Sequence, residues 1–140
     1  MREIKFRGKC KEKWLYGDFI HQDKFNRSMI KQDNYTAVVD VNTLGQYIGL
    51  KDKNGIEIYE GDIVKINKHS YDYGLKKDEI GEIKFIDGAF GFYREKTKNE
   101  YYFNDLATEN GYGELDYYEV IGNVWEDSDL LNDSKNTKSN

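Results

Sequence analysis

Short runs of β-prone residues follow one another along most of this chain, and each run is bounded by glycine, asparagine or aspartate. The first, REIKFRG at residues 2–8, alternates apolar and charged side chains with the period of a half-buried strand. WLYGDFIH follows a polar break, so we expect the first twenty residues to form a hairpin. Further strands are expected in NYTAVVDV, GQYIGL, GDIVKI, GEIKFI, GFYREK, EYYF and DYYEVIGNVW. The sequence therefore predicts a mostly β fold, whose turns depend on Gly, Asn and Asp because proline is absent.

One segment near the end of the sequence favours a helix. SDLLNDS, with Asp127 or Ser128 as its N-cap, has the pattern of a short C-terminal helix of about two turns. Residues 132–140 contain no apolar side chain, so we expect a disordered tail there.

Composition limits the class of protein. In a chain of 140 residues, 38% hydrophobic and 15% aromatic residues supply material for a compact core, in which Trp14 and Trp125 should be at least partly buried. Cys10 is the only cysteine, which excludes an intrachain disulfide and a cysteine-based zinc site. No apolar run reaches the roughly 18 residues of a membrane span, and the first residues lack the apolar centre of a signal peptide. We therefore expect a cytoplasmic protein that does not bind membranes.

The run TLGQYIGLKDKNGIEIYEGDIV at residues 43–64 raises the question of a metal site. A calcium loop of the EF-hand type needs an oxygen ligand at its fifth place, and counting from Asp52 that place is Ile56. Asn54-Gly55 instead favours a type I′ hairpin turn between two adjacent strands within residues 44–66. We expect no metal or cofactor here, and solvent exposure of the four carboxylates, Asp52, Glu57, Glu60 and Asp62.

YEGDIVKI, at the end of this run, also has a structural explanation. Glu60-Gly61 is expected to turn the chain, and Asp62 can accept hydrogen bonds from backbone N–H groups that the turn leaves free. Val64 and Ile66 are then expected in a core.

Charge is distributed unevenly along the sequence. Residues 1–35 hold nine Lys or Arg against five Asp or Glu, whereas residues 99–134 hold ten Asp or Glu and no Lys or Arg. The two regions can face each other within one monomer, or they can form a head-to-tail contact between subunits. Strand edges without proline also promote association. We therefore expect a homo-oligomer, with a monomer as the alternative.

Few residues offer catalytic chemistry. Cys10 and His21 could act as a nucleophile and its base, but Cys10 is in register with Ile4 and Phe6, which favours a core position. His21 and His69 lack the spacing of a metal site. We expect that the protein is not an enzyme, and we predict no catalytic, cofactor-binding or metal-binding residue.

Two aromatic segments allow a binding role. GAFGFYR at residues 88–94 resembles faintly the strand with which RNA-binding domains stack bases, but a hairpin turn at Asp87-Gly88 with Phe90 and Phe92 on one face accounts for the same residues. EYYFNDLATENGYGELDYYEV at residues 100–120 sets tyrosines among carboxylates, which could imitate a phosphate backbone or form a solvated surface. The candidate binding residues are Tyr101, Tyr102, Tyr117 and Tyr118.

Several blocks of the sequence, in order, resemble the signature of the YopX-like family of phage and prophage proteins. They are REIKFRGK with WLYGDF, TLGQYIGLKDKNGIEIYEGDIVKI, GEIKF and EVIGNVWEDSDLL, and they span about residues 2–131. The resemblance implies an N-terminal β region, residues 1–55, and a C-terminal SH3-like β-barrel, residues 56–131. Because the family has no assigned biochemical function, it implies no catalytic residues. Residues 67–80 match no block and are expected to form a variable loop.

Two classes of function remain. The first is a non-catalytic interaction module, encoded by a phage or prophage, that self-assembles and binds a host or phage protein in the cytoplasm of the bacterial host. The alternative is a nucleic-acid binder that uses the basic N-terminal strands, or an acidic DNA mimic that acts on a host DNA-binding protein.

Overall fold

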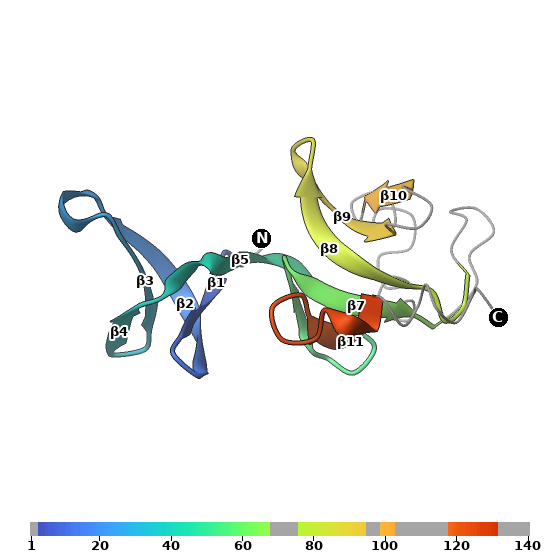
Figure 1. Cartoon of the computed structure of the whole chain (residues 1–140), viewed down its shortest axis with the longest axis horizontal. Coiled ribbons are helices and arrows are strands. Elements are labelled where there is room, and N and C mark those ends of the chain that lie inside the picture. The colour runs from blue at the N-terminus through green and yellow to red at the C-terminus, as the bar shows by residue number, and fades with distance from the viewer. Residues whose placement is uncertain (1–2, 68–75, 95–98, 103–117, 132–140) are drawn as a thin grey trace. The chain divides into compact units, whose positions relative to one another are not determined.

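The computed structural model describes residues 3–67, 76–94, 99–102 and 118–131 (Figure 1). The chain separates into two compact units, residues 1–49 and residues 50–140. The boundary expected from the sequence follows residue 55, a few residues after the boundary in the structure, which follows residue 49. The earlier boundary agrees with two hydrogen bonds into the second unit, from the N–H of Lys53 to the carbonyl of Tyr118 and from the N–H of Val120 to the carboxylate of Asp52.

Most of the described chain is extended, which confirms the mostly β prediction. The first unit contains β1 (Phe6–Cys10), β2 (Lys13–Gln22), the 3-10 turn η1 (Asp23–Phe25), β3 (Arg27–Gln32), β4 (Tyr35–Val38) and most of β5 (Asp40–Lys51). The second contains β6 (Glu57–Tyr59), β7 (Asp62–Ile66), β8 (Ile80–Ile86), β9 (Ala89–Arg94), β10 (Asn99–Tyr102) and β11 (Tyr118–Asn123). The strand orders are β4-β3-β2-β1-β5-β6 and β10-β9-β8-β7-β11.

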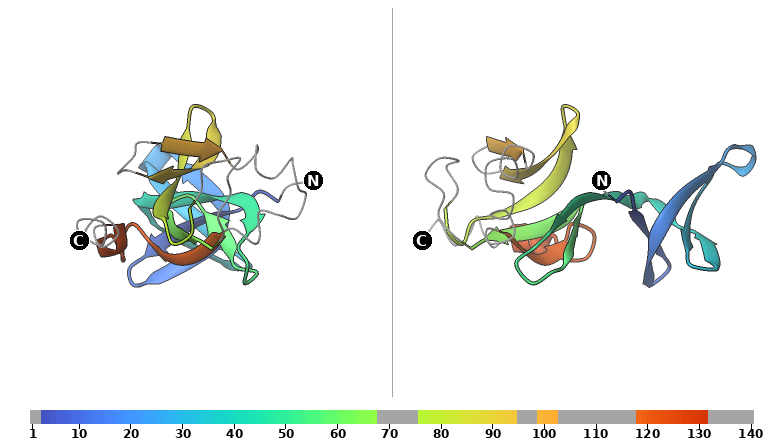
Figure 2. Two further views of the ribbon diagram at one scale, coloured as in Figure 1. Left: turned by 90° about the vertical axis from the view of Figure 1, so that its right-hand side faces the viewer. Right: turned by 180° about the vertical axis from the view of Figure 1, so that it is seen from behind.

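Strand β2 pairs with two different strands along its length, and the consecutive hairpins that result are seen in Figure 2. Its residues 13–17 pair with β1, and its residues 18–22 pair with β3. Gly17 stands where the pairing changes, and a Cβ atom there would lie 2.0 Å from the carbonyl oxygen of Lys31. Only glycine permits this approach of two backbones.

The core of the first unit lies on one face of these hairpins. Leu15, Ile30 and Val39 are buried, and the partly buried side chains packed against them are Phe6, Cys10, Phe19, Ala37 and Leu44. The expected core position of Cys10 is therefore confirmed. Ile4, expected on the same face, is 68% exposed because it precedes the first strand.

The second unit has its own core between β7, β8, β9 and β11. Ile63, Val64, Ile66, Ile83, Phe92 and Tyr118 are all buried, so the prediction for Val64 and Ile66 is confirmed. Among the described strands, no pairing joins β10 to β11, and the sheet is therefore not closed into a barrel. No helix among the described residues is long and apolar enough to cross a bilayer.

The chain after β11 forms one short helical segment, residues 129–131, which confirms a helix at the predicted place. Leu130 and Leu131 donate backbone hydrogen bonds to Asp127 and Ser128. Both tryptophans are half-buried, as expected. The predicted tail, residues 132–140, and most of the predicted variable loop, residues 68–75, lie outside the described residues.

Candidate interaction surface

A row of apolar side chains crosses the solvent-facing side of three strands in the first unit. Ile20 of β2 is opposite Met29 of β3, and Met29 is opposite Val38 of β4. Directly opposed residues of antiparallel strands share a face. Ile20 is 37% exposed, Val38 is 46% exposed and Met29 is half-buried. Because alternate residues of these strands fill the core, the apolar row lies on the outer face.

This apolar row ends at an unpaired strand edge. β4 is the first strand of its sheet, and none of the described strands lies on its outer side. The N–H of Val39 donates to the carbonyl of Ser28 on β3 at 2.9 Å. Since backbone groups alternate in direction along an antiparallel strand, Tyr35 and Ala37 also face β3, whereas Thr36 and Val38 direct their N–H and C=O groups outward.

Cationic and aromatic side chains gather along β1. The Arg7 guanidinium lies 4.8 Å and the Lys9 ammonium 6.0 Å from the centre of the Trp14 ring, and the Lys5 ammonium lies 5.8 Å from the Tyr47 ring. These distances fit cation–π contacts. Arg7 is buried, whereas Lys5 and Lys9 are half-buried. Of these three cations, only Lys5 and Lys9 are therefore in part accessible to solvent.

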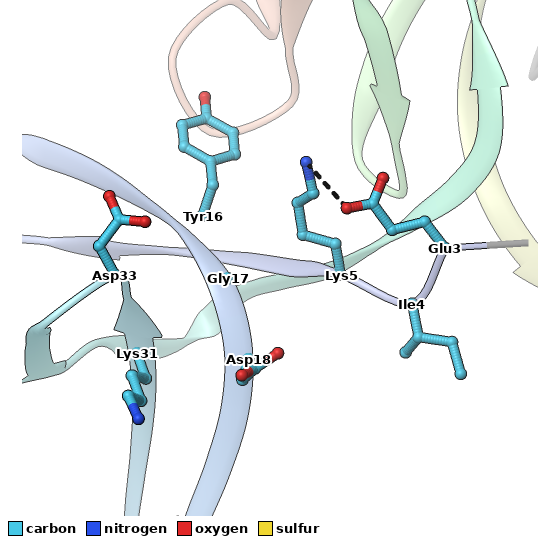
Figure 3. Close-up of a pocket in the computed structure, with 8 residues that line it drawn as sticks. All are labelled: Glu3, Ile4, Lys5, Tyr16, Gly17, Asp18, Lys31 and Asp33. Atoms are coloured by element: carbon cyan, nitrogen blue, oxygen red, sulfur yellow. Dashed lines mark ion pairs between the residues drawn. The ribbon is translucent and has the colours of Figure 1, made fainter.

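A shallow polar depression of about 470 Å³ lies beside this cluster. Its lining includes Lys5, Tyr16, Asp18 and Lys31. Figure 3 shows Tyr16 and Lys5 directed to one side of β2 and Lys31 to the other, and Lys5 paired with Glu3. The charged groups do not converge on one point, so the depression does not define a ligand.

None of the four carboxylates of the 43–64 run is fully exposed, so the prediction of their solvent exposure is wrong. Asp52 is 1% exposed and Asp62 is 2% exposed, while Glu57 and Glu60 are half-buried. Asp52 accepts hydrogen bonds from the backbone N–H groups of Asn54, Ile56 and Val120. Asp62 accepts one from the N–H of Tyr59 at 2.7 Å, as predicted. Both buried carboxylates therefore hold backbone turns in place.

The two predicted hairpin turns differ in type. Residues 44–66 contribute to three strands rather than two, and the first turn lies at residues 53–55. There only Gly55 has a positive φ, while Asp52 and Ile56 close a three-residue loop through a 2.8 Å bond from Asp52 N–H. The type I′ assignment is therefore wrong for Asn54-Gly55. Asp87-Gly88 has positive φ at both residues and joins Ile86 to Ala89, as a type I′ turn does.

The predicted aromatic sites have different environments. Phe90 and Phe92 are buried, which supports packing and leaves no ring face free for bases. Tyr118 is fully buried, with its ring centre 6.1 Å from that of Phe92, so it belongs to the core rather than to a surface. Tyr101 and Tyr102 lie in β10, opposite residues of β9. Their binding role stays a prediction, and Tyr117 lies outside the described residues.

Nothing in the described residues assembles the catalytic or metal site that the sequence left open. Cys10 packs into the core of the first unit, and His21 contacts Asp23 at 3.3 Å. The residues that the structure describes contain no group of three or more His, Cys, Asp or Glu that could hold a metal ion, and His69 lies outside them. A buried ion pair joins Glu79 to Arg94 in the second unit.

The family model described as YopX protein matches residues 5–132. The chain belongs to the YopX family. The family membership expected from the sequence blocks is therefore confirmed, and the buried Asp52 and Asp62 show that acidic positions of its longest block have structural roles.

Two solved structures resemble this YopX-family chain over nearly its whole length. Protein EF1440 from Enterococcus faecalis is 24% identical with a TM-score of 0.54, and the match covers 94% of this chain and 99% of that one. Protein yopX from Bacillus subtilis is 23% identical with a TM-score of 0.52, covering 94% and 97%. At these identities the likeness shows a shared fold. No curated protein matches the sequence.

Proposed function

We propose that this YopX-family chain is a non-catalytic interaction module, encoded by a phage or prophage, that self-assembles and binds a protein partner in the cytoplasm of the bacterial host. The observation that supports this proposal most strongly is the exposed row of Ile20, Met29 and Val38, which ends at the unpaired edge of β4. Apolar side chains beside a free strand edge favour contact with another chain. We further propose that the second unit is a partly open SH3-like barrel, since five antiparallel strands suit such a small barrel and its two outer strands, β10 and β11, are not paired.

The charge distribution supports a second contact during self-assembly. Residues 1–49 hold nine Lys or Arg against six Asp or Glu, while residues 50–140 hold twelve against twenty. A head-to-tail contact brings a positive first unit against a negative second unit of another copy. Light scattering tests this contact: the mean mass should fall when salt is raised from low to high concentration, because salt screens exposed charges. A monomer at both salt concentrations would contradict self-assembly.

Partner binding is tested by affinity capture from host cells that carry the phage. The wild-type chain and Ile20→Lys are immobilised side by side, with Ile56→Lys as the matched control. Ile56 is a 51% exposed isoleucine of the turn after β5, so its replacement adds the same charge outside the apolar row. We expect one discrete protein to be retained by the wild type and the control and lost with Ile20→Lys. Equal retention by all three would show that the apolar row is not the partner's binding surface.

Nucleic-acid binding is the second candidate, and Lys5 and Lys9, half-buried cations near the Tyr47 and Trp14 rings, favour it. A fluorescent single-stranded oligonucleotide, titrated at several salt concentrations, should bind with an affinity that falls steeply with salt if this candidate is correct. No binding at low salt would reject it. Inhibition of a host nuclease without binding of DNA would instead favour the acidic mimic.

A further inference from the structure

We infer that two copies of the chain join through their β4 strands, which pair antiparallel about a two-fold axis at Ala37. This inference rests on the proposed self-assembly, and it names the occupant of the free edge as a second copy of the same chain. The contact extends one sheet directly into the other.

The outward backbone groups of β4 fit such a pairing. Thr36 and Val38 together direct two N–H and two C=O groups away from β3. When Ala37 of one copy lies opposite Ala37 of the other, Thr36 lies opposite the second copy's Val38, and all four outward groups of each copy find partners. The edge carries no proline, lysine or bulge that would prevent this.

Neighbouring registers satisfy fewer groups. A shift that centres the axis on Thr36 places Val38 opposite Asn34, which lies in the turn before β4. A shift that centres it on Val38 places Thr36 opposite Asp40, beyond the irregular residue Val39. Ala37 is thus the centre at which Thr36 and Val38, the two residues with outward backbone groups, pair only with residues of β4.

The side chains agree with the same register. The segment NYTAVV at residues 34–39 carries no charge, so no like charges face each other across the joint. Thr36 and Val38 are both exposed and both β-branched, and such opposed pairs stabilise sheets. Asn34 lies opposite the second copy's Asp40, where an amide can donate to a carboxylate. An unrelated peptide could use the same backbone groups, but nothing would fix its register.

A two-fold contact also limits growth. Each copy uses its β4 edge once, so this pairing closes at two chains. In the second unit, the turn at residues 52–56 already covers the β11 edge of the sheet. The N–H of Lys53 donates to the carbonyl of Tyr118, and the N–H of Val120 donates to the carboxylate of Asp52. Pairing at β4 therefore yields a dimer rather than a continuous fibre through these edges.

Disulfide trapping tests the register. Ala37 forms a pair without hydrogen bonds in this arrangement, with Cα atoms about 4.5 Å apart, which is within reach of a disulfide. In a Cys10→Ala background, Ala37→Cys is expected to form a covalent dimer under mild oxidation. Thr36→Cys serves as the control, since the two copies of Thr36 lie diagonally, about 8 Å apart, and should link poorly. Efficient linking of Thr36→Cys with none of Ala37→Cys would overturn the register.

Dissociation constants test the contact itself. By light scattering over a dilution series, Val38→Lys should weaken the dimer by at least about tenfold, while Ile56→Lys, at a 51% exposed residue of the second unit, should leave it unchanged, and circular dichroism should show both folded. An oligomer unchanged in Val38→Lys, without trapping at Ala37, would overturn this inference and leave self-assembly standing. A wild-type monomer at all concentrations would overturn both.

Discussion

The carboxylate of Asp52 accepts a hydrogen bond from the backbone N–H of Val120 at 2.9 Å, across 68 positions of the chain. The same carboxylate bonds the N–H groups of Asn54 and Ile56 at 2.8 and 2.9 Å. Lys53 donates its own N–H to the carbonyl of Tyr118 at 3.1 Å. The turn after β5 is thereby attached to the outer side of β11.

Asp52→Ala is expected to lower the free energy of unfolding by about 3 kcal/mol, because three backbone N–H groups lose a charged acceptor. Asp52→Asn should cost less, since it retains one oxygen. Urea denaturation measures both. Glu12→Ala, in the exposed turn after β1, is the control and should change the free energy of unfolding by less than about 0.5 kcal/mol. Similar small changes in the free energy of unfolding for Asp52→Ala and Glu12→Ala would show that the Asp52 hydrogen bonds do not stabilise the fold.

Gly61→Ala should destabilise the second unit more than Gly55→Ala does. Both glycines have positive φ, +93° and +81°, so each alanine incurs about 1–2 kcal/mol of backbone strain. A Cβ at Gly61 would also lie 2.2 Å from the Trp125 ring, whereas a Cβ at Gly55 would have no other atom within 4 Å. We expect an additional loss of about 2 kcal/mol at Gly61 from overpacking.

Thermal unfolding of the two glycine variants, alone and combined with Trp125→Ala, measures this difference. Trp125→Ala should remove the extra loss at Gly61 and leave the effect of Gly55→Ala unchanged. Equal losses in the two single variants would show that the indole yields to the new methyl group.

The contribution of the buried Glu79–Arg94 ion pair to the free energy of unfolding should require both side chains. Glu79 also accepts the N–H of Lys76 at 2.8 Å, and both side chains of the pair are 7% exposed. Arg94→Leu leaves a buried carboxylate, with an expected cost of about 3–5 kcal/mol. The double replacement by leucine should cost less than the sum of the single ones.

Denaturation of the two single variants and the double variant gives the coupling energy of this pair. The partly exposed pair of Lys5 and Glu3, 3.6 Å apart, is the comparison, and Glu3→Ala should cost less than about 1 kcal/mol. Strict additivity for Glu79 and Arg94 would contradict their coupling.

Calcium or magnesium at millimolar concentration should leave the melting temperature unchanged. Asp52 and Asp62 already accept backbone hydrogen bonds, and neither has a described cluster of ligands around it. An ion that preferred the native state would raise the melting temperature. A rise of several degrees in either metal, absent with sodium at equal ionic strength, would contradict the structural role of these carboxylates.

Local turn chemistry made several features predictable. Asp87-Gly88 takes the type I′ geometry because its closing pair, Ile86 and Ala89, leaves room for only two residues. Asn54-Gly55 was located correctly, but its geometry depends on Asp52, whose carboxylate fixes a longer loop. The burial of Asp52 could not be read locally, since one of its donors comes from Val120.

The candidate surface could not be derived from the sequence for a similar reason. β3 was missed because RSMIKQ places its two apolar residues, Met29 and Ile30, next to each other rather than in alternation. Ile20 and Val38 belong to separate runs, and only the register of β2, β3 and β4 brings them into one row with Met29. A face formed across strands has no signature along any one of them.

The pairing of β11 with β7 has a consequence for the order in which the chain folds. β1 to β4 form successive hairpins that close short loops, whereas Ile66 meets Tyr118 only after a long loop has closed. Contacts between distant positions form slowly, so the first unit and the β8–β9 hairpin should form early and β11 should dock late. Losing the Asp52 bond to Val120 should therefore accelerate unfolding more than it slows folding. The lifetime of the native second unit is then set by how long its last strand stays docked.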